Sequence, residues 1–243
     1  MTLPSIQTLY DVCEQTWPCA AQFEAGGFTI RDGKGGGKRV SAATLNGALE
    51  DAKFDDAEAA MTTLNQPMLF QLREGENELD TQLEARGYQI IDPVNVYAAK
   101  AEILATELPP RTVAIPAWEP LQIMKEIWAE GGLGPERVEV MMRANVVKTG
   151  FISRWNDHPA GTSYLGMHQG ISMLHALEIK QEQRRNGLAR WAMRRAGFWT
   201  LENGGHTVSV ICVKTNKAAN ALYQSLGMSL IGSYHYRIKE PYG

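Results

Sequence analysis

Five arginines lie within one short stretch of the chain, residues 183–196, which reads QRRNGLARWAMRRA. Arg184 and Arg185 stand just before Gly187, and apolar residues recur at helical spacing after this glycine. The first turn of a helix leaves N–H groups without partners, and the helix dipole favours an anion there. Glycine lets a phosphate approach the backbone, and arginine adds charge and a forked donor. These residues could therefore bind a phosphate group.

Two other interpretations compete with a phosphate site. The arginines could form a solvated helix face, as Arg190 and Arg194 do if Trp191 and Trp199 point into the core. They could also contact nucleic acid. The net charge of −3 argues against a chain built mainly to coat a polyanion.

A strand and a helix must position this loop. ISMLHALEI, residues 171–179, alternates like a central strand, with Met173, Leu177 and Ile179 predicted on one side. His175 would share that side, and Glu178 would point to the other. A short loop then leads to the helix that begins at Gly187.

The clearest boundary in the chain is ATELPPRTVAIPAWEP, residues 105–120, whose four prolines predict an extended connector. We therefore expect a domain at 1–104, a linker at 105–119 and a second domain at 120–243. Alternating strands and helices predict an α/β (α+β) fold with a mixed sheet. Helices are expected at 6–16, 57–64, 78–87, 121–130, 136–144 and 216–227, and strands at 26–32, 38–44, 68–73, 88–91, 94–100, 150–155, 162–167 and 207–213, followed by two last strands.

A faint repeat links the two halves. LDTQLEARGYQIIDPVNVYAAK and ANALYQSLGMSLIGSYHYRIK both run helix, glycine, strand, turn, strand when Gly87 is aligned with Gly227. Either the halves share an ancestral design, or both carry a generic helix–strand–strand ending.

The bulk composition favours a soluble cytoplasmic protein. The chain has 243 residues, of which 44% are hydrophobic, enough for one large or two small domains. Its three cysteines show no pairing or metal-ligand spacing, and no apolar run approaches the length of a membrane span. The glycine cluster at residues 32–38 lacks the Walker spacing, and we interpret it as a mobile hairpin tip.

The phosphate loop resembles that of a known superfamily. Residues 184–189, Arg-Arg-Asn-Gly-Leu-Ala, are similar to the Arg/Gln-x-x-Gly-x-Gly/Ala loop of the GNAT N-acetyltransferases. Residues 216–228, NKAANALYQSLGM, resemble that family's Asn-x-x-Ala-x-x-Leu-Tyr-x-x-x-Gly-Phe helix. The resemblance covers about 171–239 specifically. It implies a mostly antiparallel central sheet flanked by helices, with the first half as a degenerate copy in a tandem member.

The resemblance also implies the donor site. The loop amides would hold the pyrophosphate of acetyl-CoA, and the backbone near Leu177 and Ile179 would pair with its pantetheine arm. The implied cofactor-binding residues are Leu177, Ile179, Arg184, Arg185, Asn186, Gly187, Leu188, Ala189 and Asn216. Ala189, Gln181 and Met228 depart from the commonest family residues without threatening this site. The first half has no such loop, so we expect one acetyl-CoA site.

Acetyl transfer needs a proton donor for the departing thiolate. A phenol with a pKa of about 10 suits this role, and the resemblance points to Tyr223 as the general acid. Tyr223 and Asn216 are seven residues apart and should share a helix face, away from Leu222 and Leu226. The alternative for Tyr223 is a packing role.

The base that deprotonates the amine is harder to assign. Several superfamily members are similar in placing an acidic residue at the position of His175, and histidine is chemically suited. A hydrogen-bonded core histidine is the alternative, with Glu178 in reserve and His168 and Asp157 at the substrate edge.

The sequence thus predicts an N-acetyltransferase that moves an acetyl group from acetyl-CoA to a primary amine by direct transfer. The acceptor, a small molecule or peptide, would bind within residues 121–168. We expect no metal, nucleic-acid or membrane partner, and a monomer or homodimer. The competing hypothesis is a non-catalytic CoA-binding regulatory module.

Overall fold

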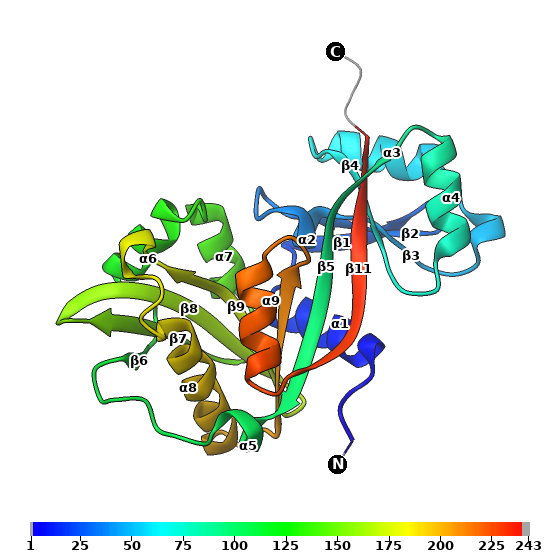
Figure 1. The fold of residues 1–243 in the computed structure, drawn as a ribbon. Helices are drawn as coiled ribbons and strands as arrows, with labels where there is room; N and C mark the ends of the chain where they lie inside the picture. The colour runs from blue at the N-terminus through cyan, green and yellow to red at the C-terminus, as the bar shows by residue number, and fades with distance from the viewer. Residues whose placement is uncertain (1, 240–243) are drawn as a thin grey trace. The chain divides into compact units, whose positions relative to one another are not determined.

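The computed structural model describes residues 2–239, which form two compact units (Figure 1). Among the described residues, the larger unit holds 2–18, 96–212 and 216–231. The smaller unit holds 19–95, 213–215 and 232–239. Neither unit is continuous in sequence. The predicted domains at 1–104 and 120–243, with a linker at 105–119, remain a prediction.

The sheet of the larger unit confirms the predicted fold class. Its strand order is β5-β10-β9-β8-β7-β6, in which β9 and β10 run parallel and the pairs from β9 to β6 run antiparallel. The strands are β5 (Gln89–Lys100), β6 (Ala114–Ala117), β7 (Val147–Trp155), β8 (His158–His168), β9 (Ile171–Ile179) and β10 (Thr207–Val213).

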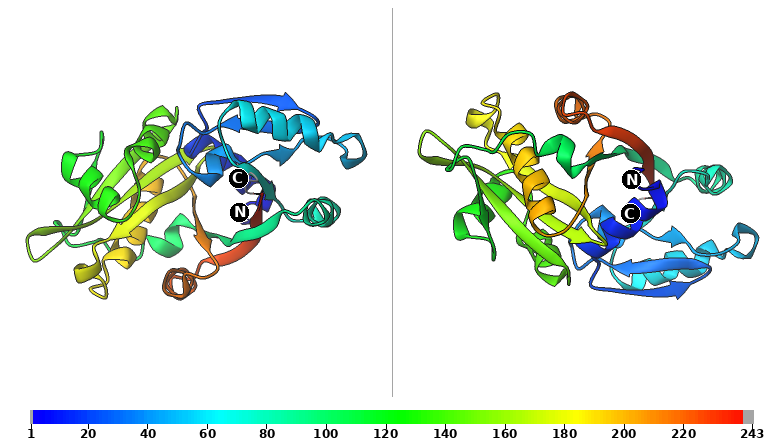
Figure 2. Two further views of the ribbon diagram at one scale, coloured as in Figure 1. Left: turned by 90° about the horizontal axis from the view of Figure 1, so that it is seen from above. Right: turned by 90° about the horizontal axis from the view of Figure 1, so that it is seen from below.

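Helices cover both faces of this sheet (Figure 2). One face carries α8 (Leu188–Glu202), whose Met193, Ala196 and Trp199 pack on Leu165 and Leu174. The other face contacts α1 and α6. The remaining elements of this unit are α5 (Ala101–Leu104), α7 (Pro135–Arg143), η2 (Gln181–Gln183) and α9 (Lys217–Ser225), with α1 at Ile6–Thr16 and α6 at Gln122–Glu130.

Local sequence explains where several helices begin. The Ser5 hydroxyl accepts a hydrogen bond from the Thr8 N–H, 3.2 Å away, and so caps α1. Pro135 stands in the first turn of α7, where a missing N–H costs nothing. Asn216 caps α9 by accepting from the Ala219 N–H at 3.1 Å. The sequence predicts each of these three helices to within a few residues.

The smaller unit has an aromatic core. Phe28, Phe54, Phe70 and Tyr88 meet with ring centroids between 5.0 and 6.2 Å apart. Around them lie β1 (Ala21–Ala25), β2 (Phe28–Asp32), α2 (Lys38–Ser41), β3 (Thr44–Leu45), η1 (Leu49–Asp51), α3 (Phe54–Thr63), β4 (Met68–Leu72) and α4 (Asn77–Ala85). The end of β11 (Ser229–Lys239) pairs antiparallel with β4.

The structure corrects the predicted hairpin of this unit. β2 pairs with β1 across Gly26 and Gly27, which have φ of +59° and +78°, as a tight turn requires. Residues 38–41, predicted as a strand, are helical in α2. The glycine cluster at 32–38 therefore connects β2 to α2 and is not a hairpin tip. The Ser41 hydroxyl donates to the Gly37 carbonyl and the Ala42 N–H to the Lys38 carbonyl, so short-range hydrogen bonds close a helical turn here.

The structure adds a strand to the predicted connector and corrects the predicted strand pairs. The proline-rich connector includes β6, which pairs with β7 over Ala114–Ala117, because an edge strand tolerates proline. The predicted strand pairs after Gly87 and Gly227 are each one continuous strand, β5 and β11.

The two segments aligned in the faint repeat, α4 with β5 and α9 with β11, each begin in one compact unit and end in the other. α4 leads into β5 in the smaller unit, and β5 then ends within the larger unit, where Tyr97 contacts Tyr223. α9 leads into β11 in the larger unit, and β11 ends within the smaller unit beside β4. Each helix–strand segment of the faint repeat thus supplies its last residues to the other unit.

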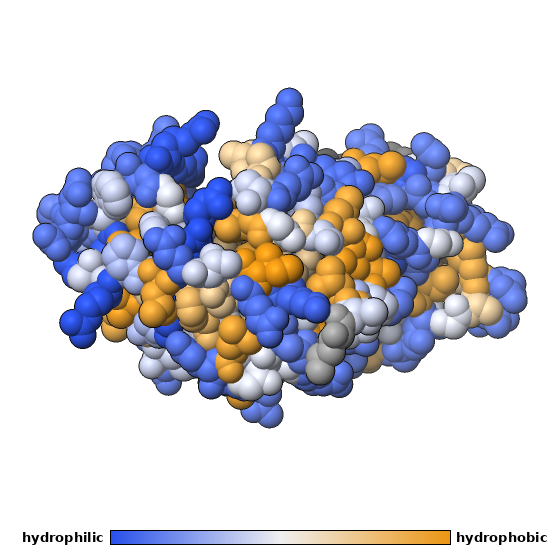
Figure 3. Space-filling model, turned by 60° about the horizontal axis from the view of Figure 1, so that its bottom comes forward, coloured by the Kyte–Doolittle hydropathy of each residue, from blue (hydrophilic) through white to orange (hydrophobic). Residues whose placement is uncertain are grey.

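Some large hydrophobic side chains remain exposed, among them Leu108, Val147 and Leu230. On the face drawn in Figure 3, hydrophobic surface is interrupted by hydrophilic side chains. Within residues 2–239, the helices all fall short of the length and apolarity that crossing a membrane demands.

Candidate active site

The parallel strands β9 and β10 separate partway along their length. They pair over Ile171–Leu174 and Thr207–Val210, yet β9 continues to Ile179 and β10 to Val213. A bulge in β9 accompanies the separation, since Tyr164 of β8 pairs with His175 while Thr162 pairs with Glu178. Backbone amides in this part of β9 are therefore available to a ligand between the strands.

Ala176 forms the bulge. Its φ of +51° lies in the left-handed region, which a non-glycine residue adopts only when its surroundings hold it there. The Trp128 indole of α6 donates a hydrogen bond to the Ala176 carbonyl over 2.8 Å and is one such restraint.

The bulge corrects the predicted faces of β9. Leu174 and Leu177 both pack against the cluster under α8, and Ile179 packs beside Leu188 of α8. His175 instead contacts α1 on the opposite face, so the prediction that it shares a side with Leu177 and Ile179 was wrong. Glu178 lies against Gly131 at the end of α6, on the face that His175 occupies. The extra residue in the strand shifts the alternation by one position.

The arginine–glycine loop leads into α8 as predicted. Gly187 precedes the helix with φ of +75°, and no side chain caps the first turn of this 15-residue helix. A Cβ on Gly187 would meet only the Trp191 indole nitrogen, 3.9 Å away. The uncapped N–H groups and the open space at Gly187 fit an anionic group such as a pyrophosphate.

The side chains of the loop divide into two roles. The Arg184 guanidinium donates to the Ile179 carbonyl at 3.1 Å and forms an ion pair with Glu178 at 3.3 Å. Asn186 donates to the Gln183 carbonyl. Both side chains thus brace the loop, while Arg185 is exposed with φ of +70°. Leu188 is buried and Ala189 half-buried, so these two residues can offer only backbone groups to a ligand.

The predicted face of α9 is wrong in detail. Tyr223 is buried in one cluster with Leu226, against which Leu222 also packs, whereas Asn216 is exposed. Asn216 is the capping residue outside the helix, so helical spacing does not carry it onto the Tyr223 face. Asn220 lies there instead, and its side-chain amide reaches the Cys212 sulfur at 3.6 Å.

Tyr223 has an environment suited to donating a proton. Burial, followed by Cys212 and Tyr97, raises its pKa, so the phenol stays protonated at neutral pH. Its hydroxyl has no hydrogen-bond partner among the residues that the structure describes. The neighbouring Cys212 also has its pKa raised by burial, to about 11, which makes its thiol a poor nucleophile.

His175 is 4% exposed and lies among aromatic rings. The ring centroids of Trp17 and Tyr164 are 5.0 and 5.9 Å from that of His175. The Thr16 hydroxyl oxygen lies 2.8 Å from Nε2 of the histidine.

His168 and Asp157, predicted at the substrate edge, lie at opposite ends of β8. His168 closes the strand opposite Ile171. Asp157 precedes the strand, and its exposed carboxylate lies 3.8 Å from Arg154. The structure therefore does not bring these two residues together.

Sequence reasoning missed four residues around the site. Tyr97 and Asn220 adjoin Tyr223, and Thr16 and Trp17 adjoin His175. No pattern in the sequence singled out Tyr97. No pattern in the sequence connects the end of α1 with β9.

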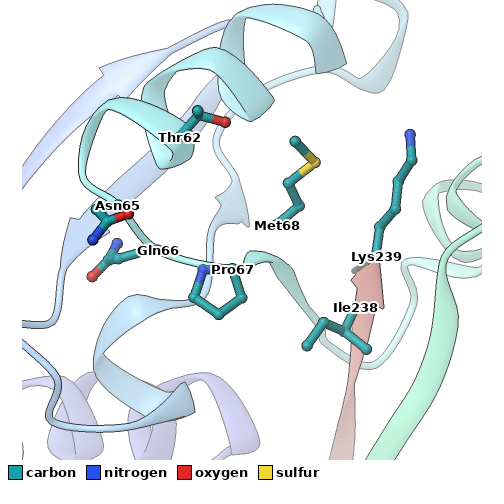
Figure 4. A pocket seen from close by; sticks show the side chains of 7 residues that line it. All are labelled: Thr62, Asn65, Gln66, Pro67, Met68, Ile238 and Lys239. Atoms are coloured by element: carbon teal, nitrogen blue, oxygen red, sulfur yellow. The ribbon is translucent and has the colours of Figure 1, made fainter. Parts of the chain in front are cut away.

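A separate pocket of about 580 Å³ lies in the smaller unit (Figure 4). Its charged lining residue is Lys239, whose ammonium lies 3.8 Å from the Glu58 carboxylate. The lining consists of Thr62, Asn65, Gln66, Pro67, Met68, Ile238 and Lys239, and includes none of the predicted site residues. Within residues 2–239, His, Cys, Asp and Glu side chains form no group of three or more that could hold a metal ion.

The separated parallel strands, the bulge and the glycine loop before a helix lie together in the second half of the sequence. Residues 121–228 match the sequence profile of the Acetyltransferase (GNAT) family. Residues 121–228 are therefore a GNAT acetyltransferase domain, which takes up 108 of the 243 residues.

Relatives share the arrangement of nearly the whole chain. The uncharacterized N-acetyltransferase YobR of Bacillus subtilis (strain 168) is 23% identical over 98% of this chain and 100% of its own. The structure of a GCN5-related N-acetyltransferase from Kribbella flavida is similar with a TM-score of 0.70 and 14% identity, over 97% of this chain and 95% of that one. A tandem GNAT protein from the clavulanic acid biosynthesis pathway has a TM-score of 0.58 and 14% identity, over 77% and 69% of the two chains.

Proposed function

We propose that this acyltransferase moves the acetyl group of acetyl-CoA to a primary amine of a small molecule or peptide within one ternary complex. The observation that carries the proposal is the separation of β9 from β10 beside the uncapped start of α8. A thioester arm between the strands and a pyrophosphate at Gly187 would occupy these two features.

Each step has a candidate group in the chain. Acetyl-CoA supplies the activated acetyl group. Backbone N–H groups of Leu177 and Ile179 orient the arm and polarise the thioester carbonyl. His175 takes one proton from the substrate ammonium, and the neutral amine that results attacks the thioester carbonyl. The Tyr223 hydroxyl gives a proton to the departing thiolate, and the Tyr223 phenolate regains a proton when the new amide nitrogen loses its second one. The C–N bond forms as the C–S bond breaks, so no acetyl group rests on the protein. The raised pKa of Cys212 supports direct transfer, because a protonated thiol does not attack a thioester.

We also propose that residues 1–104 descend from a second GNAT domain that lost its donor loop, with 105–119 as the linker and 120–243 as the catalytic half. The reciprocal places of β5 and β11 support a common origin of the halves. Likeness to a tandem GNAT protein is consistent with it at the level of the fold.

Calorimetric titration with acetyl-CoA, followed by a thiol-release screen of primary amines, tests the proposal. We expect one saturable donor site and amine-dependent release of CoA thiol. Absence of donor binding to the folded chain would refute the donor assignment. Binding without turnover of any amine, with Tyr223→Phe indistinguishable from the wild type, would favour a regulatory CoA-binding module.

A further inference from the structure

The end of α1 holds the ring of His175. Thr16, the last residue of this helix, is fully buried. Its hydroxyl lies 2.7 Å from the Val12 carbonyl and 2.8 Å from Nε2 of His175. A carbonyl oxygen can only accept, so the single hydroxyl proton of Thr16 goes to Val12. The hydroxyl oxygen must then accept from the histidine, which places a proton on Nε2.

We propose that Thr16 is a positioning residue, which fixes His175 in the Nε2–H tautomer and thereby makes Nδ1 the nitrogen that accepts the proton of the amine. The inference rests on the proposed function, in which His175 is the base. It assigns to the first helix of the chain a part in acetyl transfer, although this helix lies far before the segment that matches the family profile.

The packing around Thr16 also helps to hold the His175 ring in place. A Cβ on Gly166 of β8 would lie 2.9 Å from the Cβ of Thr16, so only glycine lets the helix end approach the sheet this closely. Trp17 and Tyr164 hold the imidazole plane by ring contact. These contacts fix the ring that the Thr16 hydrogen bond orients.

The helix end also favours the protonated form that catalysis creates. α1 has 11 residues and ends at Thr16, so its partial negative charge lies beside His175. When Nδ1 takes a proton, the Nε2–H bond to Thr16 persists and becomes charge-assisted. The partial negative charge and the charge-assisted hydrogen bond together offset part of the free-energy cost of a protonated imidazole in a buried site.

Imidazole ¹⁵N spectra of the full-length chain test the tautomer directly. Spectra are recorded about two pH units above the usual imidazole pKa, where histidine is neutral. The His175 signals are assigned by their loss in His175→Gln. We expect a protonated Nε2 in the wild type and in Thr16→Ser, and a mixture of tautomers in Thr16→Val. A proton on Nδ1 in the wild type, or an unchanged tautomer in Thr16→Val, would overturn the proposal.

Measurements of kcat distinguish a positioning role of Thr16 from a purely structural one. With the best amine of the screen, we expect Thr16→Val to lower kcat about tenfold, as loss of one hydrogen bond allows, with unchanged acetyl-CoA affinity. Thr16→Ser should restore the rate, and Gly166→Ala, which displaces Thr16 without removing its hydroxyl, should lower it. If Thr16→Val keeps the wild-type kcat while His175→Gln is slow, the positioning role of Thr16 is refuted. Wild-type kcat in His175→Gln would refute the base assignment alone, and the tautomer spectra would still stand.

Discussion

The phenol of Tyr97 donates a hydrogen bond to the side-chain oxygen of Asn220 over 2.9 Å, although 123 positions separate the two residues. Asn220 in turn donates to the Asn216 carbonyl at 2.7 Å, and the Tyr97 ring lies 5.7 Å from that of Tyr223. A strand from the first half of the sequence therefore helps to build the surroundings of the proposed general acid.

Tyr97→Phe should remove this hydrogen bond and keep the ring contact. We expect a loss of about 1 kcal/mol in the free energy of unfolding, and a several-fold lower rate of thiol release. Thermal melts and the amine assay measure the two effects. Tyr88→Phe is a matched control, because its hydroxyl donates to Glu58 at 2.8 Å in the smaller unit. Equal rates in the two variants would contradict a role for Tyr97 at the site.

The raised pKa of Tyr223 gives a prediction about pH. A general acid works while it is protonated, and a pKa above its ordinary value extends that range upward. The kcat profile should therefore show no basic decline from this residue below about pH 10, the ordinary tyrosine pKa. Tyr223→Phe should lower kcat about 100-fold and leave the calorimetric affinity for acetyl-CoA unchanged. A basic decline near pH 9 that disappears in Tyr223→Phe would show that the pKa is not raised.

Gly187→Trp should abolish donor binding by filling the space before α8. Gly204 provides a matched control at the other end of the same helix, with φ of +79° and nothing within 4 Å of its Cβ position. Both substitutions force a side chain into the left-handed region and should cost about 1–2 kcal/mol of stability. Calorimetry should show acetyl-CoA binding to Gly204→Trp only. Binding of similar affinity to both variants would mean that the pyrophosphate lies elsewhere.

Features that depend on residues close together in the sequence were predicted, and features that depend on distant residues were not. The loop before α8 and the helix α9 depend on residues close together in sequence, and both were predicted, although Asn216 was expected within α9 and is its capping residue. The Ala176 bulge was not, because its restraint includes a hydrogen bond from Trp128, a residue 48 positions away. One inserted residue then moved His175 to the other face of the sheet, which alternation alone cannot reveal.

Contacts between distant segments account for the other omissions. Thr16 reaches His175 across 159 positions, and nothing in the composition of α1 marks its last residue as part of a site. The glycine that admits it, Gly166, is one of 23 in the chain. A glycine needed for close packing is distinguishable from a turn glycine only when the neighbouring atoms are known.

The smaller unit contains a buried cation whose partner should control stability in acid. The Arg237 side chain is 4% exposed, and its Nε donates to Asp80 at 2.7 Å, while His235 Nε2 lies 2.8 Å from the same carboxylate oxygen. The hydrogen bond from Arg237 is the largest cause that holds the pKa of Asp80 below its usual value, opposed by burial and aided by His235.

Because the pKa of Asp80 is lower in the folded state, its contribution is complete above the unfolded value of about 3.9 and is lost as the pH falls through the folded value. Asp80→Asn should therefore destabilise the chain by about 2 kcal/mol at pH 7 and flatten the decline of stability below pH 4. Urea unfolding at several pH values measures both effects. Glu84→Gln is the control, since this carboxylate is 71% exposed and 3.7 Å from Arg237, and it should change stability by less than about 0.5 kcal/mol. Equal losses of unfolding free energy in the two variants would show that the charge of Asp80 contributes no more than a surface ion pair. The hydrogen bond from Arg237 to the Tyr88 carbonyl, 2.9 Å away, would then be what stabilises the buried guanidinium.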